Sequence, residues 1–245
     1  MHDSRSFFAR PSVFAVAFGC AIASFGMTAS PADAAIITAA DSASLDRDTS
    51  GVTAGVASMY IGDGGDHARY GGLFAFTLPD LGLVANPFQT ASLSLTVIGT
   101  QTNNSFGNQQ SPLVGLTTAG VPLARPTPTF LSTDNSSTTT PIGLSISYTN
   151  QTALGTYTTS GTLLRDYLNT AYAAGLGANQ NVFFRLDPAG GLIFSKGFTV
   201  AGASNATEAN RPVINYTAVE AGVPEPTGVM LAIAAAPLLL RRRKA

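Results

Sequence analysis

The chain has 245 residues and a formal net charge of −1, and only 11% of its residues are charged, against about 25% in an average soluble domain. No basic excess is available to neutralise phosphates, so the composition argues against nucleic acid as a partner. The apolar fraction of 45% is too high for a disordered chain. The single cysteine excludes an intrachain disulfide framework and a multi-cysteine metal site.

Residues 1–35 have the pattern of a secretion signal. Arg5 and Arg10 form a basic start, and an uncharged apolar run follows from Ser12 to Met27. Small residues then stand at the positions that a signal peptidase reads, which predicts cleavage after Ala34 or after the next residue. The alternative is a transmembrane helix, although a cleavage pattern follows the apolar run at once. We therefore predict export through the secretion translocon.

Residues 36–221 are predicted to form one β domain. Apolar and hydroxyl residues alternate strictly over 91–97 and again over 142–148, and the segment 73–78 places its large apolar residues on one face. This period of two is typical of strands with one buried face and one face in water. Further strands are predicted from composition at 181–186, 192–200 and 212–219.

One helix is predicted within this domain, over residues 162–174. Leu164, Leu168 and Tyr172 recur with helical spacing, either Ser160 or Thr162 is placed to cap its start, and a glycine follows its end. Residues 127–141 are predicted to form a polar loop. Many short strands with one helix indicate an antiparallel β-sandwich of jelly-roll type, flanked by the N-terminal signal helix and a short C-terminal apolar helix.

The order of features within the domain is similar to that of a known family. A strand in Tyr70–Leu81 leads to Leu-Pro, the Ser/Leu alternation and the helix follow, and Arg211–Tyr216 closes the domain. This resembles the DNRLRE-type, carbohydrate-binding-like jelly rolls of secreted bacterial proteins. The chain departs from that pattern in having no tryptophan at the helix end and only Ser195-Lys196 in place of the family's Ser-Arg/Lys-Glu motif.

Residues 222–245 combine three features in a fixed order. A Pro-Glu-Pro turn comes first, an apolar run from Val229 to Leu240 follows, and a basic cluster ends the chain. At about 1.5 Å per helical residue the apolar run reaches roughly 18 Å, which is short for a hydrocarbon core of about 30 Å. The basic cluster is expected to stay in the cytoplasm. An ordinary tail anchor is one interpretation of this segment.

The same tail resembles a PEP-CTERM sorting signal, which is the substrate of the membrane enzyme exosortase. The resemblance implies that Pro224, Glu225 and Pro226 are the recognition motif and that processing occurs near them. It assigns the basic stop cluster to Arg241, Arg242, Arg243 and Lys244. It further implies transient anchoring in the inner membrane of a Gram-negative bacterium that makes exopolysaccharide, followed by transfer to the cell surface or extracellular matrix.

One turn carries a pattern of oxygen ligands. Asp46, Asp48 and Ser50 alternate before Gly51, as in the first half of a calcium loop. The twelfth position is Ala57 rather than the bidentate glutamate, so an ordinary polar turn is the alternative. Calcium is the only cofactor that the sequence raises. Asp63 and Asp66, on a second glycine-rich turn, are candidates to converge on the same place.

Catalytic motifs are weak in this sequence. His67 is the only histidine after the signal, and no Gly-x-Ser-x-Gly elbow accompanies it. Candidate sugar contacts are the tyrosines of the predicted strands and turns, namely Tyr60, Tyr70, Tyr148 and Tyr157. We therefore expect an exported, non-catalytic surface or matrix protein that contacts exopolysaccharide. The alternatives are a secreted enzyme acting on extracellular polysaccharide, and a purely structural or adhesive surface protein.

Overall fold

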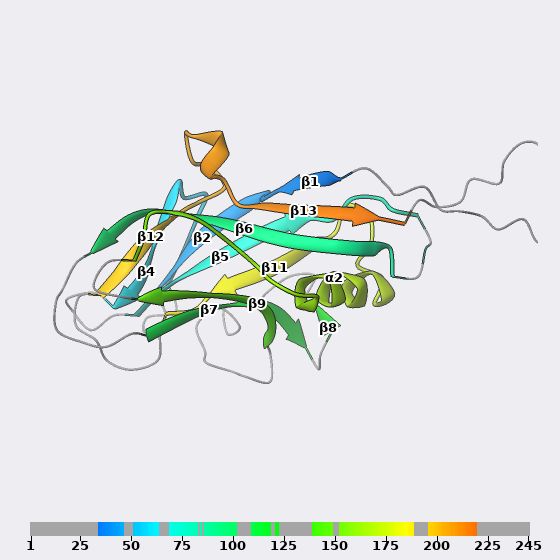
Figure 1. The fold of residues 1–245 in the computed structure, drawn as a ribbon, viewed down its shortest axis with the longest axis horizontal. Coiled ribbons are helices and arrows are strands. Elements are labelled where there is room, and N and C mark those ends of the chain that lie inside the picture. The colour runs from blue at the N-terminus through cyan, green and yellow to red at the C-terminus, as the bar shows by residue number, and fades with distance from the viewer. Residues whose placement is uncertain are drawn as a thin grey trace, which may run out of the picture.

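The computed structural model of the protein describes residues 34–46, 51–63, 69–82, 84, 86–101, 109–118, 121–122, 139–148, 152–188 and 196–219. This part of the chain is mainly β. Thirteen strands join in one antiparallel sheet that curls over, and a single described α-helix lies beside it (Figure 1). No described helix is long and apolar enough to cross a membrane. Residues 1–33 of the predicted signal and the whole predicted tail, 222–245, lie outside the described residues.

One half of the sheet is built around its longest strand, β6. The strands β12 and β13 lie end to end along one edge of β6, with 202–212 between them, and β10 pairs with the other edge. On the outer side of this edge, β4 pairs with β12 and β1 pairs with β13. The strands of this half are β1 (Ala35–Thr38), β4 (Ser58–Asp63), β6 (Phe88–Gln101), β10 (Gly155–Thr158), β12 (Lys196–Ala201) and β13 (Val213–Ala218).

The other half has the order β3-β2-β5-β11-β7-β9, with β8 beside the end of β7. The two halves join where the last residues of β4 pair with the first residues of β5. The strands of this half are β2 (Asp41–Asp46), β3 (Gly51–Ala54), β5 (Arg69–Thr77), β7 (Gln109–Thr118), β8 (Val121–Pro122), β9 (Thr139–Tyr148) and β11 (Asn181–Leu186).

The main apolar core receives side chains from both halves of the sheet and from the helix. In β6 the alternating Leu93, Leu95 and Val97 are buried, while Ser92 and Ser94 point to the other face and are partly exposed. The predicted alternation is therefore confirmed for this strand. The same core takes residues from β5, β11 and the helix, among them Phe74, Phe76, Val182, Phe184, Leu164 and Leu168.

The strand β5 differs from its prediction in one respect. Phe74, Phe76 and Leu78 do face the core, but Leu73 and Ala75 on the opposite face are also buried, at 8% and 7% exposure. Leu73 belongs to a second apolar cluster with Ala43, Leu45 and Leu116 from the neighbouring strands. The expectation of a wet face was thus wrong here, because apolar residues from several strands gather on both sides of β5.

The helix α2 (Leu163–Ala173) confirms the prediction over 162–174. It ends in a Schellman motif, in which Leu176 N–H donates to Ala171 O and Gly175 N–H donates to Tyr172 O. Gly175 has a φ of +85°, a conformation that glycine adopts without strain. At the other end Thr162 is the N-cap residue, but its hydroxyl donates to the Asp166 carboxylate rather than capping a backbone N–H.

The remaining predicted strands are placed with small shifts. β11 has the predicted bounds, and β13 is one residue shorter at each end than the predicted 212–219. β12 begins at Lys196, and 192–195 of the predicted strand lie outside the described residues. The predicted loop at 127–141 lies outside them up to residue 138, and its last three residues belong to β9.

Candidate functional site

A polar surface covers the outer face of the half built around β6. Because directly opposed residues of paired antiparallel strands share a face, the registers place side chains of β10, β6, β13 and β1 on one surface. We call this surface the hydroxyl face. It consists of Thr38, Thr90, Ser92, Ser94, Thr96, Thr156, Thr158, Asn215, Thr217, Ile36 and Val213. None of these side chains carries a charge.

The hydroxyls of this face pair across the strands. Thr90 and Thr217 are joined by a hydrogen bond of 2.7 Å between their hydroxyls. On the other edge of β6, Ser94 bonds to Thr158 at 2.9 Å, and the Thr96 and Thr156 hydroxyls are 3.3 Å apart. A hydroxyl has one donor and two acceptor sites, so each pair keeps one donor and further acceptor sites. Thr96 is only 9% exposed, so in its pair Thr156 is the residue that a ligand can reach. The face thus presents both donors and acceptors at the strand spacing of about 4.8 Å.

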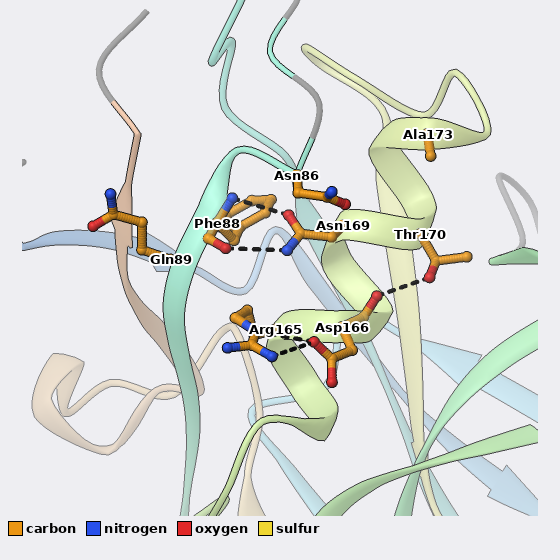
Figure 2. Close-up of a pocket in the computed structure, with 8 residues that line it drawn as sticks. All are labelled: Asn86, Phe88, Gln89, Arg165, Asp166, Asn169, Thr170 and Ala173. Atoms are coloured by element: carbon orange, nitrogen blue, oxygen red, sulfur yellow. Dashed lines mark hydrogen bonds and ion pairs between the residues drawn. The ribbon is translucent and has the colours of Figure 1, made fainter. Parts of the chain in front are cut away.

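A pocket lies between α2 and the first residues of β6 (Figure 2). Its volume is about 570 Å³, which lies in the range of pockets that hold small ligands. Most of the lining residues are polar: Asn86, Phe88, Gln89, Arg165, Asp166, Asn169, Thr170 and Ala173. Gln89 precedes Thr90 of the hydroxyl face, so the pocket and this face adjoin on the same strand.

Asn169 fixes the inner wall of the pocket. Its Oδ1 accepts the Phe88 N–H at 2.9 Å, and its Nδ2 donates to the Phe88 carbonyl at 3.0 Å (Figure 2). The side-chain amide therefore pairs with the strand edge as a neighbouring strand would. Phe88 is buried against Tyr172 and Tyr216, which holds this end of the strand in the core.

An ion pair forms the lower wall of the pocket in Figure 2. Arg165 donates from Nε and from Nη2 to one oxygen of Asp166, at 2.9 and 2.7 Å. This contact with the guanidinium is the main cause that lowers the pKa of the Asp166 carboxyl, so the carboxylate stays ionised at neutral pH. The guanidinium Nη1 has no partner among the described residues. The charges of the pair cancel, and the pocket is electrically balanced.

Two backbone irregularities occur at the rim of the pocket. A β-bulge lies at the start of β6, because Thr217 pairs with Thr90 and Ala218 pairs with Phe88, which leaves Gln89 as the extra residue. Asn86 has a φ of +54°, a left-handed conformation that is uncommon for residues other than glycine. β-Bulges and left-handed residues other than glycine are common near functional sites. The backbone at the rim of the pocket departs from regular strand geometry in both of these ways.

Two of the predicted sugar-contact tyrosines come together. The rings of Tyr60 in β4 and Tyr70 in β5 have an edge-to-face arrangement with centroids 5.9 Å apart, and the Tyr60 hydroxyl donates to the Asp63 carbonyl. Tyr157 lies apart from them on β10, where its hydroxyl donates to the Ala153 carbonyl. Tyr148 is the last residue of β9. The four tyrosines therefore do not form one platform.

The predicted calcium turn lies in the sequence between β2 and β3, which pair with each other. Asp46 ends β2 and pairs with Gly51, the first residue of β3, and residues 47–50 lie outside the described residues. Asp48 and Ser50 lie outside the described residues, as do Asp66 and His67. Asp63 is buried at the end of β4, and the pairing of Tyr70 with both Asp46 and Gly62 brings Asp46 and Asp63 to the same end of the sheet. Calcium binding at this end stays a prediction.

The residues of the predicted processing sites lie mostly beyond the described part. Ala34, the predicted signal cleavage position, is described and exposed, and it immediately precedes β1. Pro224, Glu225, Pro226 and the basic cluster at 241–244 lie outside the described residues. Comparison with protein-family models and with curated proteins finds no match for this chain. The two family resemblances therefore rest on the motif residues alone.

The pocket was missed by the sequence reasoning. Arg165, Asp166 and Asn169 stand next to the apolar positions of the predicted helix. Polar residues at such positions are typical of the solvated face of a helix. The pairing of Asn169 with Phe88 joins residues 81 positions apart, which no local pattern contains. A buried ion pair was also missed: Arg185 of β11 is 1% exposed and donates from Nη2 to Asp187 at 3.0 Å.

Proposed function

We propose that this is an exported, non-catalytic surface or matrix protein that contacts exopolysaccharide through the hydroxyl face. The observation that carries the proposal is the uncharged set of paired hydroxyls across β10, β6 and β13. A polysaccharide presents rows of hydroxyls that both donate and accept hydrogen bonds, and this face offers the complementary groups. We further propose that the curled sheet is a sandwich of jelly-roll type, since the main core takes side chains from both of its halves.

The weakness of single contacts on such a face suits a polymer ligand. A hydroxyl that exchanges water for a sugar contributes only about 0.5–1.5 kcal/mol, because the water bonds that it replaces are nearly as good. Many sugar units bound side by side multiply these small contributions through effective concentration. The low charge of the face makes this binding insensitive to salt, in contrast to binding by a charged surface.

The proposed route to the polymer follows from the two ends of the sequence. The N-terminal segment directs export, and the tail holds the protein in the inner membrane until an exosortase-type enzyme processes it near Glu225. The basic cluster at 241–244 keeps the last residues in the cytoplasm during this step. What supports this route is the order of the Pro-Glu-Pro turn, the short apolar run and the basic cluster, together with the N-terminal signal.

The test of the contact is co-sedimentation of the purified protein with exopolysaccharide from the producing bacterium. The double variant Thr156→Val and Thr158→Val removes two hydroxyls from the face without changing side-chain shape. We expect it to weaken binding about tenfold, the effect of two lost hydrogen bonds. The control is Thr53→Val on β3, which is equally exposed but lies in the other half of the sheet.

Two results would overturn the proposal. One is equal binding of the double variant and the control, which would move the contact elsewhere. The other is the absence of saturable binding, which would favour a structural or adhesive role. The enzyme alternative is tested in the same samples, since a hydrolase or lyase would shorten the polymer during incubation whereas a binding protein leaves its length unchanged.

A further inference from the structure

The pocket between α2 and β6 has the chemistry of a site for a small polar ligand. It offers the free Nη1 group of Arg165, the carboxamide of Asn86, and the second oxygen of Asp166, which accepts only from Thr162 among the described residues. Asn86 likewise has no described partner. Donors and acceptors therefore stand close together, as a polyhydroxylated ligand requires.

The charge balance of the pocket selects among such ligands. The Arg165 cation is held against the Asp166 carboxylate, so an anionic ligand that approached Arg165 would also meet a fixed negative charge. A neutral ligand meets no such repulsion. Phe88 is 2% exposed and presents almost no ring surface to the pocket, so stacking contributes little and hydrogen bonds determine what binds.

We propose that this pocket binds a neutral saccharide unit, and that it acts as an end site for a chain that continues over the hydroxyl face. The continuity comes from β6, where the bulged Gln89 at the pocket is followed by Thr90, whose hydroxyl pairs with Thr217 on the face. This inference rests on the proposed contact with exopolysaccharide, and it specifies which part of the polymer is recognised and where.

The framework of the pocket is rigid enough to serve this role. Asn169 is 8% exposed, and its carboxamide bonds to both the N–H and the carbonyl of Phe88. These two bonds fix the distance between the helix and the strand. Thr170 donates its hydroxyl to the Asp166 carbonyl within the helix, so it too is held in place. A pocket whose walls are already positioned loses less entropy when a ligand binds.

The test uses short oligosaccharides prepared from the exopolysaccharide of the producing bacterium and separated into neutral and acidic fractions. Binding of each fraction to the purified protein is measured by titration calorimetry. We expect the neutral fraction to bind at least tenfold more tightly than the acidic fraction. Arg165→Met should weaken binding of the neutral fraction at least tenfold, since it removes the free guanidinium donors while keeping the helix.

Two further variants complete the experiment. Asn86→Gly removes the carboxamide but suits the left-handed backbone at this position, so it should weaken binding without unfolding the protein. Arg211→Met is the matched control, because Arg211 is a partly exposed arginine paired with Glu208, distant from the pocket in sequence and absent from its lining. The Arg211→Met variant should bind the neutral fraction with the affinity of the unmodified chain. Thermal melting of each variant checks that it is folded.

The outcomes separate this inference from the proposed function. If the polymer still co-sediments and depends on Thr156 and Thr158, while Arg165→Met and Asn86→Gly bind the neutral fraction as the unmodified chain does, the pocket inference is wrong and the proposed function stands. Tighter binding of the acidic fraction would also overturn the inference. If the polymer does not bind at all, the proposed function fails and the inference fails with it.

Discussion

Gly115 of β7 leaves space for the ring of a buried tyrosine. A Cβ at this position would lie 2.4 Å from Cε2 of Tyr167, and that ring is held by hydrogen bonds from its hydroxyl to the Leu116 and Phe183 carbonyls. The ring therefore has little freedom to move away. The contact explains why a strand that faces the helix carries its smallest residue here.

We predict that Gly115→Ala destabilises the protein by about 1–3 kcal/mol, the range for overpacking a closed core. The matched control is Gly177→Ala, where the nearest atom to the new Cβ is 3.8 Å away. Chemical denaturation of the two variants measures the difference. Equal midpoints would show that the Tyr167 ring is free to shift, contrary to the packing described.

Tyr167 gives the protein a pH-dependent stability. Burial raises the pKa of its hydroxyl above the ordinary value of 10.0. A raised folded-state pKa means that the folded protein holds the proton more tightly than the unfolded chain, so the stabilisation is complete below pH 10. It is lost as the pH rises from 10 towards the folded-state pKa.

We therefore predict that stability declines above pH 10 and that Tyr167→Phe makes this decline shallower. Below pH 9 the same variant should be less stable by about 1–2 kcal/mol, because the buried Leu116 carbonyl and the partly buried Phe183 carbonyl lose their donor. Denaturant midpoints measured from pH 8 to 11 check both effects. The decline will not vanish, because burial also raises the pKa of Tyr172 and Tyr216.

At the scale of elements, the helix α2 is tied to β6 by the polar side chain of Asn169 as well as by its apolar face. The Asn169 amide takes the place of a strand along the free edge of β6 at Phe88. β10 pairs only with residues 94–97 of β6. Asn169 therefore covers the edge of β6 beyond the end of β10. The helix thus provides hydrogen-bond partners for the Phe88 N–H and carbonyl, which would otherwise be buried without partners.

We predict that Asn169→Ala costs about 1–3 kcal/mol, the penalty for leaving buried backbone groups unsatisfied. Thr170→Ala is the control on the next residue of the helix, since its exposed hydroxyl bonds only to the carbonyl of Asp166 in the same helix. Hydrogen exchange of the Phe88 amide reports the contact directly. Unchanged protection of that amide in Asn169→Ala would contradict the account.

The calcium prediction belongs to the hairpin of β2 and β3. If Asp46, Asp48 and Ser50 hold the ion, then calcium stabilises the folded state and raises the melting midpoint relative to a chelated sample. Asp46→Asn should reduce that shift, whereas Asp41→Asn at the opposite end of β2 should leave it intact. An equal midpoint with calcium and with chelator would identify an ordinary polar turn.

The elements that the sequence predicted well are those whose signal is local. The alternation of Leu93, Leu95 and Val97 follows directly from one strand facing a core, and α2 follows from apolar residues at helical spacing. Contacts between distant segments carry no such signal. The second buried face of β5 depends on residues of β2 and β7, and the pocket depends on a strand and a helix far apart in the chain.

At the scale of the whole molecule, the proposed sorting step makes a prediction about the precursor. Glu225→Gln, or replacement of the basic cluster at 241–244 by neutral residues, should leave unprocessed protein in the membrane fraction. The mass of the product in whole cells and in the medium measures this. A mature mass identical to that of the unmodified protein would show that these residues are not the signal.

On the proposed route, the pairing of β1 with β13 would set the orientation of the molecule on the membrane. Ala35 pairs with Tyr216, and the Val219 N–H donates to the Pro87 carbonyl, so the chain enters and leaves the described domain through neighbouring strands at one end. Asp46 and Asp63, the last residues of β2 and β4, lie near the opposite end of the long strand β6, about 45 Å away at 3.3 Å per residue.

On the proposed route, the leader and the tail would therefore hold the domain by the same end. The long strand β6 would stand upright on the membrane, with Asp46 and Asp63 at the end away from the bilayer and the hydroxyl face along one side. A polymer chain leaving the membrane could then lie along the protein before the tail is cut. Orientation would thus be set before release, because the pairing of β1 with β13 brings both attachments to one end of the domain.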